Sequence, residues 1–355
     1  MRLSRVSISP AATSRRQFVV AALALLPKPL SACGLAGLET PHKIGSLVLT
    51  ASDKGGEFDR ISVDCPFVFR HKGLFHMTYV AFDGIGYQTG MASSRDLVHW
   101  EKRGCILRRD PASPITQYNI ALNWILRENN LRSAGNLIPV NGRYLGVYHA
   151  YPNSGYEQGA AVIGLCRSGD LSRWELEAPC LRAEDGADWE RGGLYKPCLV
   201  KDGASYYLFY NAKNQAASRW HEQTGVAIST DLKTWKRYEG NPILRNGPPG
   251  SPDSRFASDP CVLKHGKQWA LYYFGLDDRG VARDLVATSG DLLHPTKCGE
   301  IVIDVGAPGS VDSSYAHKPS LIAHKGDLYH FYCAVSRVNG KEVRGISVAR
   351  SRAWT

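Results

Sequence analysis

Ionisable side chains stand directly before a proline at four places in this chain. The four sets are Asp64-Cys65 before Pro66, Tyr195-Lys196 before Pro197, Ser258-Asp259 before Pro260 and His317-Lys318 before Pro319. Buried charges are costly unless they are paired or functional, so acids, lysines and a histidine in one repeated position indicate a site. Paired carboxyl groups suit bond cleavage in which one group donates a proton and an ionised carboxylate works from the opposite face.

These positions belong to an internal repeat. The pattern Ser-x-Asp-Leu-x-x-Trp occurs at residues 94–100, 168–174 and 229–235, and residues 289–292 give a copy without the tryptophan. Each of the four prolines opens an apolar run that is followed by glycine and a tyrosine-rich run. A weaker version of this second pattern begins at residues 136–138. Five units of about 60 residues result.

Each unit reads as three strands joined by turns, after which the Asp-Leu-x-x-Trp stretch turns into an outer fourth strand. Four-stranded units at this spacing are typical of propeller blades. The sequence therefore predicts an all-β fold, a five-bladed β-propeller around a central channel, over residues 34–355. Residues 45–50 are expected to complete the last blade, and the Asp/Trp signature is expected to form turns and to pack between blades.

In such a propeller, the starts of the inner strands and the loops between the second and third strands meet at one end of the channel. The residues before the prolines therefore converge, although they lie about 60 positions apart. The loops add further acids at this mouth, namely Asp83, Glu157, Glu222, Asp277 and Asp278. Glu222 in particular is placed there by the repeat, because residues 222–225 occupy the place of residues 87–90 in the first unit.

The formal net charge of +10 does not indicate a nucleic-acid partner. Half of it comes from five cations in residues 1–32, which contain no acid, and no run of Lys and Arg appears in the remainder. Binding to a phosphate backbone needs clustered charge. A mild attraction to an acidic polysaccharide stays open.

The first 33 residues resemble a signal sequence for export. Ser14-Arg15-Arg16-Gln17-Phe18 resembles a twin-arginine signal, and it leads into an apolar stretch too short to span a bilayer. Leu30-Ser31-Ala32-Cys33 resembles a lipobox, in which Cys33 would be lipidated. We therefore expect a periplasmic or cell-surface lipoprotein whose only membrane contact is the lipid on Cys33, with an ordinary cleaved signal as the alternative.

The other eight cysteines do not read as a disulfide framework or a metal site. They include no Cys-x-x-Cys pair, and two of them recur at one repeat position, as small buried side chains would. Zinc-ligand spacing is absent, no motif for Ca²⁺ is present, and no cofactor is predicted.

The repeat resembles the five-bladed propeller glycosidases, glycoside hydrolase families 43, 32, 68, 117 and 130, from about residue 44 to the C-terminus. The likeness rests on the Asp-Pro strand starts and on the Gly-x-Ala-x-Ser-x-Asp-Leu-x-x-Trp runs at residues 90–100 and 225–235. In those families catalytic carboxylates lie one or two residues before the blade-opening proline, where Asp64 and Asp259 match. The sequence departs from the pattern in having Asp-Cys-Pro at residues 64–66 and no strand-opening Glu-x-Pro for the usual acid.

The resemblance implies a role for each candidate residue. Asp64 is expected to be the general base that activates water, and Asp259 to orient the sugar and tune the acid. Glu222 is the first choice for the acid and His317 the second, with Glu190 as a further carboxylate. Residues expected to bind substrate are Lys196, Lys318 and Arg191 on hydroxyls or a carboxylate, Glu190, Asp83 at the mouth, and Trp124, Trp189 and Trp220 against sugar rings.

The sequence thus predicts a glycosidase that releases a sugar from an extracellular oligo- or polysaccharide, acting from the end of the glycan and with inversion. Two alternatives stay open, a non-catalytic glycan-binding propeller and a glycoside phosphorylase that would use the same lysines for phosphate. The long segment 105–132 is expected to shape the choice of substrate.

Overall fold

The computed structural model describes Cys33, residues 36–214 and residues 220–354. The predicted twin-arginine signal and residues 30–32 of the lipobox lie outside the described residues. Within them the regular structure is almost entirely β-strand, with one 3-10 turn at Ala183–Asp185, so the predicted all-β class is confirmed. No described helix is long and apolar enough to cross a membrane.

The strands follow one another in antiparallel groups. The first group is β2 (Ser62–His71), β3 (Leu74–Phe82), β4 (Tyr87–Ser94) and β5 (Glu101–Leu107), and the second is β6 (Ala121–Ile125), β7 (Tyr144–Ala150), β8 (Val162–Ser168) and β9 (Glu175–Leu181). A third group is β10 (Gly193–Asp202), β11 (Ser205–Lys213), β12 (Glu222–Ser229) and β13 (Lys236–Arg237). Then come β14 (Phe256–His265), β15 (Gln268–Leu276), β16 (Ala282–Ser289) and β17 (Thr296–Ile303), and finally β18 (Tyr315–His324), β19 (Asp327–Val338) and β20 (Lys341–Arg350), which pairs with β1 (His42–Lys43).

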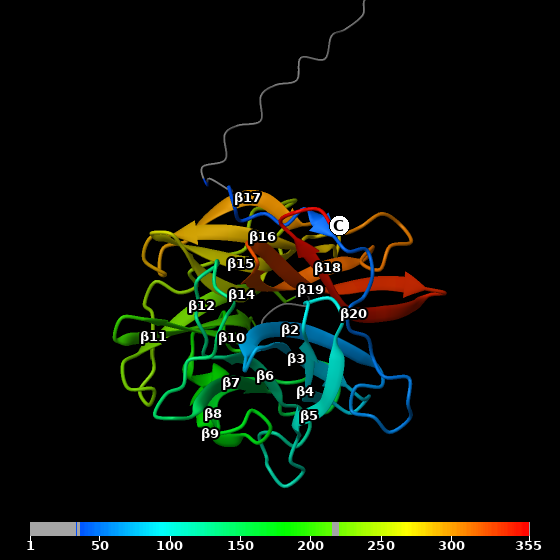
Figure 1. Ribbon diagram of the computed structural model, residues 1–355. Helices are drawn as coiled ribbons and strands as arrows, with labels where there is room; N and C mark the ends of the chain where they lie inside the picture. Colours follow the sequence, from blue (N-terminus) through cyan, green and yellow to red (C-terminus); the bar gives the residue numbers. More distant parts are fainter. Residues whose placement is uncertain (1–32, 34–35, 215–219, 355) are drawn as a thin grey trace, which may run out of the picture. The chain divides into compact units, whose positions relative to one another are not determined.

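The first strands of these groups lie against one another. β2 contacts β6 and β18, β10 contacts β6 and β14, and β14 contacts β18. In Figure 1 these first strands lie nearest the middle of the strand groups, with the later strands farther out. The hydrogen-bonded sheets are not closed on one another, because the last three groups share one 12-stranded sheet and the first two form separate 4-stranded sheets. Five closed blades therefore stay a prediction.

The second group begins elsewhere than the sequence suggested. Its first strand is β6, whereas residues 136–138, taken as the weak strand start, make only isolated bridges to Arg70 and Arg127. The expected long loop 105–132 is correspondingly shorter, since its ends belong to β5 and β6. The error has a physical origin: β6 opens without a proline, so the repeat signal is absent there.

Four of the first strands carry the same distortion. Each is ten residues long, and its pairing with the second strand slips beside the proline at its fifth position. The residue before that proline has a positive φ of 52° at Cys65, 51° at Lys196, 52° at Asp259 and 70° at Lys318. Such a bulge re-aims a side chain that ordinary alternation would point elsewhere. A left-handed conformation is uncommon for residues other than glycine and recurs at functional sites.

A segment after β6 crosses the opposite end of the first strands. The Arg127 guanidinium donates to the carbonyl oxygens of Val68 in β2 and Leu321 in β18. Further along the segment, the Asn129 amide donates to the carbonyl oxygen of Leu199 in β10, and the backbone N–H of Leu131 donates to Lys264 in β14. Residues 127–136, called the crossing segment below, thus tie together the first strands of all the groups.

The Asp/Trp signature forms turns, as predicted. In the first copy the Asp96 carboxylate accepts the backbone N–H groups of Val98 and His99, and the Trp100 indole donates to the Leu97 carbonyl oxygen. The later copies repeat the carboxylate contacts at Asp170, Asp231 and Asp291. These residues therefore shape the strand connections.

The N-terminal part of the described chain is attached to the last two groups. The Leu38 carbonyl oxygen accepts the Tyr272 hydroxyl, β1 pairs with β20, and Leu49 forms a bridge to Ile346, so the expected completion by residues 45–50 holds in part. Cys33 forms a disulfide with Cys298 of β17. The sequence does not predict this pair, because the lipobox resemblance assigns Cys33 to lipidation. A sulfur in a disulfide cannot also carry a thioether-linked lipid, so the paired state excludes lipidation of Cys33.

Replacing Arg127 tests the crossing segment. Arg127→Met removes the donors to two buried carbonyl groups while it keeps an apolar stem, and an unpaired buried polar group costs about 1–3 kcal/mol. We expect the free energy of unfolding, measured by urea denaturation, to fall by about 2–4 kcal/mol. Arg132→Met, an exposed arginine of the same segment, is the control and should change stability by less than about 1 kcal/mol. Equal losses in both variants would contradict this role.

Candidate active site

A cavity of about 330 Å³ opens at the starts of the first strands, where the four distorted residues meet. Its ionisable lining residues are Cys65, His149, Glu157, Lys196, Glu222, Asp259, His317, Lys318 and Arg344. Its aromatic lining residues are Tyr87, Tyr151, Tyr156, Tyr195, Trp220, Phe256, Phe274 and Tyr315. The convergence expected from the repeat is therefore found for Lys196, Lys318, Asp259, His317 and Glu222.

Glu222 is a buried carboxyl group at the wall of this cavity. Burial and the nearby charge of Glu157 raise the pKa of Glu222 to about 7. Its Oε1 accepts the Trp220 indole N–H at 3.1 Å, and its Oε2 accepts the Ser258 hydroxyl at 2.7 Å. A carboxyl group that keeps its proton near neutral pH is suited to act as a general acid.

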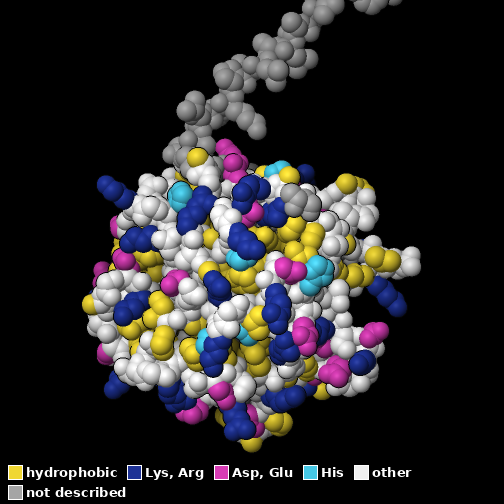
Figure 2. Space-filling model, in the orientation of Figure 1, with side chains coloured by type: hydrophobic (Ala, Val, Ile, Leu, Met, Phe, Trp, Pro, Cys, Tyr) yellow, Lys and Arg dark blue, Asp and Glu magenta, His cyan; other side chains and the backbone are white. Residues whose placement is uncertain are grey.

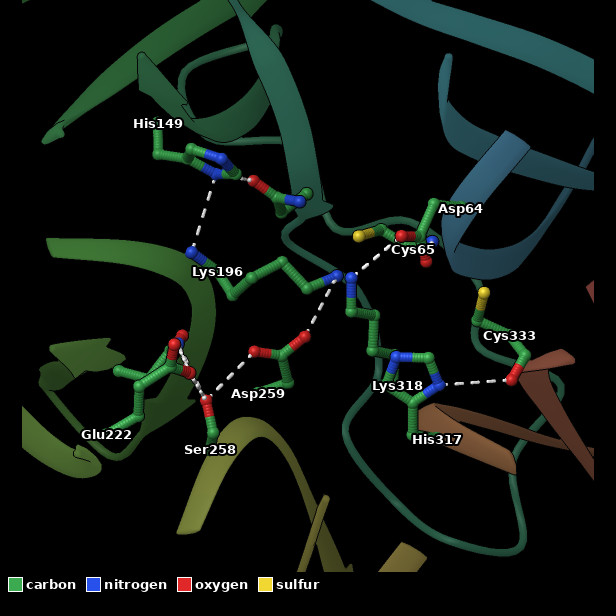
Figure 3. Close-up of polar contacts among 12 residues, drawn as sticks. Asp64, Cys65, His149, Lys196, Glu222, Ser258, Asp259, His317, Lys318 and Cys333 are labelled. Atoms are coloured by element: carbon green, nitrogen blue, oxygen red, sulfur yellow. Dashed lines mark hydrogen bonds and ion pairs between the residues drawn. The ribbon is translucent and has the colours of Figure 1, made fainter. Parts of the chain in front are cut away.

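Asp259 lies beside Glu222 rather than across from it. Figure 3 shows Ser258 between the two carboxyl groups, and the same Ser258 hydroxyl lies 3.2 Å from Asp259 Oδ1. Asp259 Oδ2 has no hydrogen bond within the described residues and lies 3.7 Å from the Lys196 ammonium. Burial raises the pKa of Asp259, although Lys196 and Lys318 oppose this. Asp259 thus lines the cavity, and its expected role of orienting a sugar stays a prediction.

Asp64 stands behind the wall and does not line the cavity. Its Oδ2 accepts Lys318 Nζ and Arg344 Nη1, each at 2.7 Å, and its Oδ1 accepts the Cys65 backbone N–H. Burial acts against ionisation, but the charges of Lys318 and Arg344 hold the pKa of Asp64 well below its usual value. A carboxylate so fully engaged is a poor proton acceptor, so the expectation that Asp64 activates water is not supported by this geometry.

The two histidines at the cavity have lowered pKa values, which favours their neutral form. Burial and the charge of Lys318 hold the pKa of His317 well below its usual value, and its Nδ1 lies 3.2 Å from the Cys333 carbonyl oxygen (Figure 3). A neutral imidazole with Nδ1–H engaged in this way presents a lone pair at Nε2, so His317 can accept a proton but is unsuited to the acid role. Burial and Lys196 likewise lower the pKa of His149, which Asn123 contacts.

Comparison with known proteins shows which family the chain resembles. Residues 129–302 match the family model of the glycosyl hydrolases family 32 N-terminal domain. The levanase of Bacillus subtilis (strain 168) is 29% identical over 181 residues, 47% of this chain but 24% of the levanase, so the chain spans about a quarter of that curated relative. A solved structure of a BT0996 RGII complex is 30% identical with a TM-score of 0.76, over 88% of this chain and 92% of that protein. A solved structure named glycoside hydrolase is 29% identical with a TM-score of 0.75, over the same shares.

The chain belongs to the superfamily of β-propeller glycosidases. In this propeller glycosidase the lysines of the cavity are already engaged with carboxylates. Lys318 and Arg344 share Asp64, and Lys196 faces Asp259. These ion pairs connect neighbouring strand groups and place the lysine and arginine side chains at the surface of the cavity. A site in which Lys196 and Lys318 wait unpaired for a substrate carboxylate is therefore not what the geometry provides.

Five of the predicted substrate-binding residues do not line the cavity. Asp83 pairs with Arg109, Glu190 accepts the Tyr210 hydroxyl and Arg237, and Arg191 faces Asp188 at the surface. Trp124 is buried in β6 against Phe67, and Trp189 stacks on Tyr210. These side chains stabilise turns and packing between strand groups. Trp220, by contrast, lines the cavity and is 42% exposed, as a sugar platform requires.

Several lining residues were missed as site candidates. Arg344 comes from β20, where no repeat signal marks it, and His149 and Tyr151 come from the end of β7 and just after it. Glu157 was noted only as a loop acid, although its Glu-Gln-Gly sequence matches the glutamate loop at residues 222–225. The described residues contain no cluster of His, Cys, Asp or Glu that could hold a metal ion.

The raised pKa of Glu222 predicts a pH-dependent stability. In the unfolded chain this carboxyl group ionises near its ordinary pKa of 4.5, whereas the folded protein keeps the proton up to about pH 7. Folding therefore takes up a proton between these values, and the free energy of unfolding must fall as the pH rises through them. Glu222→Gln removes this dependence.

Urea denaturation at about pH 5 and pH 8 measures the effect. The parent should lose about 2–3 kcal/mol more than Glu222→Gln between the two pH values, from about 1.4 kcal/mol for each unit of pKa. Glu184→Gln, at an exposed position, is the control and should follow the parent. The same pH dependence in the parent and in Glu222→Gln would show that the Glu222 proton is lost at its ordinary pKa.

Proposed function

We propose that this propeller glycosidase hydrolyses a glycosidic bond with Glu222 as the general acid. The observation that carries the proposal is a buried carboxyl group of raised pKa in a cavity that two other carboxyl groups line. Glycosidic cleavage requires a protonated group beside the leaving oxygen. Trp220 and Ser258, which contact the two oxygens of Glu222, would hold it in a fixed orientation.

Glu157 is proposed as the carboxylate that activates water, in place of Asp64. It lines the cavity, is only partly buried, and has a left-handed backbone conformation with φ of 52°. Its carboxylate raises the pKa of Glu222, so the two groups lie near enough to interact. Glycosidic cleavage uses a second carboxyl group in the same site, and of the two others that line the cavity Glu157 is the one that is only partly buried.

The mode of action is proposed to be removal of a terminal sugar with inversion, by a five-bladed propeller. A cavity of about 330 Å³ is at the small end of the usual range for ligand sites, which favours one terminal unit over a long bound glycan. The crossing segment joins the first strands at the end opposite the cavity, which also favours a bound terminal unit over a glycan that passes through. Because one similar structure is named for its complex with RGII, RGII is the first glycan to test.

Two variants separate the acid from the base. Glu222→Gln should slow release of sugar from an oligosaccharide by about 10²–10⁴-fold, because the leaving oxygen is no longer protonated. The same variant should retain most activity on an aryl glycoside whose phenol is acidic enough to leave unaided. Glu157→Gln should be slow on both substrates. In the parent, kcat/KM should fall above about pH 7 as Glu222 ionises.

Asp83→Asn, outside the cavity, is the control and should behave as the parent does. Equal loss on both substrates in Glu222→Gln would refute the acid role, and full activity of Glu157→Gln would refute the base role. Release of a sugar phosphate only when inorganic phosphate is present would make the protein a phosphorylase. If the parent binds the glycan and neither it nor any variant cleaves the glycan, the protein is a glycan-binding propeller. The anomeric form of the product that is released first, followed by NMR, tests whether cleavage inverts the configuration at the anomeric carbon.

We also propose that the chain is exported and that Cys33 forms a disulfide with Cys298 in the mature protein. The twin-arginine motif and the short apolar stretch support export. An exported protein meets an oxidising environment, in which such a pair persists. Lipidation at Cys33, the expectation from the lipobox, is the competing use of the same sulfur.

Matched variants decide between the two uses of Cys33. If the disulfide forms, Cys33→Ser and Cys298→Ser should each lower the free energy of unfolding by about 2–4 kcal/mol, and the double variant should lose no more. Non-reducing peptide mapping should yield the two cysteine peptides joined. Lipidation would instead give a protein that is released from membranes by Cys33→Ser but not by Cys298→Ser.

A further inference from the structure

The end of the strand groups opposite the cavity gathers basic side chains. The first turn of three groups carries an exposed lysine, namely Lys72, Lys267 and Lys325, and Lys201 is exposed beside the corresponding turn, at the end of β10. Because these turns occupy the same place in the repeat and the first strands lie against one another, they share one end. Arg132 of the crossing segment and Arg70 of β2 lie at the same end, where the Arg70 backbone N–H donates to Gly135. These six residues are called the basic end below.

The cations of the basic end have no carboxylate partner among the described residues. Among the acids at this end, Asp202 pairs with Lys264 and Asp327 pairs with Arg352, while Glu128 of the crossing segment accepts the Asn136 amide. Arg132 donates to the Gly37 carbonyl oxygen, and Arg70 lies over the Phe75 ring. The cations of this end, with Lys264 and Arg352 included, outnumber these three acids and Glu39, so the end keeps a net positive charge.

The positive charge of this end lowers the pKa values of two histidines. Burial and the charge of Lys72 lower the pKa of His71. Burial, Lys325 and Arg70 lower the pKa of His324, although Asp327 opposes this. Arg70 comes from the first strand group and Lys325 from the last, so cations of different groups act on the same side chain.

The basic end is charged rather than apolar. The exposed large hydrophobic side chains of the described chain lie elsewhere, at residues such as Ile85 and Trp220 on the cavity side and Val338 at the tip of the β19–β20 hairpin. Figure 2 shows one face of the molecule with Lys and Arg spread across its middle, while most Asp and Glu lie toward its edge. A surface of this kind favours a hydrated polyanion over insertion into a lipid bilayer.

We propose that the basic end binds an acidic polysaccharide, a polymer that carries carboxylate groups along its length. The partner lies at the opposite end from the cavity, so a polymer held there leaves the mouth open to its own substrate. Binding of this kind depends on counterion release and on screened charge, and so it weakens steeply with salt. The proposal does not depend on hydrolysis.

The test uses polygalacturonate as the probe and the whole protein. The parent should bind immobilised polygalacturonate at low salt and should lose at least about tenfold in affinity when the salt is raised to physiological levels. The triple variant Lys72→Glu, Lys267→Glu and Lys325→Glu should bind at least about tenfold more weakly at low salt. Thermal unfolding of each variant, followed by circular dichroism, verifies that it is folded.

The control is a triple variant with the same change of charge at the cavity end, Lys54→Glu, Arg337→Glu and Lys341→Glu, three exposed residues. It should keep binding close to that of the parent. Equal loss in both triple variants would overturn the proposal in favour of net charge alone. Equal binding to uncharged dextran would overturn it as well, and so would preferred binding to vesicles of anionic phospholipid.

Discussion

Four residues with left-handed backbone conformations, each directly before a proline, determine where the chemistry of this protein lies. A regular strand alternates its side chains between the two faces of the sheet, so none of them would be directed into a cavity at the end of the strand. At Cys65, Lys196, Asp259 and Lys318 the bulge turns one side chain out of that alternation and into the cavity. The proline that follows has no N–H to donate, so the ladder is interrupted at that position in any case. Each such conformation costs about 1–3 kcal/mol, which the ion pairs and packing around it must offset.

The ion pairs follow from this geometry. Once Lys318 is turned inward, its ammonium lies beside Asp64 of the neighbouring strand group, and Arg344 completes the arrangement from β20. Lys196 meets Asp259 in the same way, from one group to the next. The groups are thus joined by charge at the cavity end and by the crossing segment at the other. Glu222 lies between these two sets of contacts, where burial and the charge of Glu157 raise its pKa to about 7.

Repetition made much of this predictable from sequence. The all-β class, the turns at the Asp/Trp signature, and the convergence of Asp259, Glu222, His317, Lys196 and Lys318 follow from residues at equal places in equal units. What could not be predicted depends on contacts between units. Asp64 matched a catalytic position, but only the structure shows Arg344 and Lys318 neutralising it. The sequence offers three tryptophans as sugar platforms, and only the structure shows Trp124 buried, Trp189 stacked on Tyr210 and Trp220 in the cavity wall. The first strand of the second group lacks the proline that marks the others, and Cys33 reaches Cys298 over a separation of 265 residues.

The crossing segment also has a consequence for how a glycan enters and leaves the cavity. Because residues 127–136 tie the far ends of the first strands together, we infer that a glycan bound in the cavity would not pass out at that end. Under the proposed removal of terminal sugars, the released sugar would leave by the opening through which the substrate came. The remaining glycan would then withdraw before its next end could enter, so that cleavage would be distributive rather than processive.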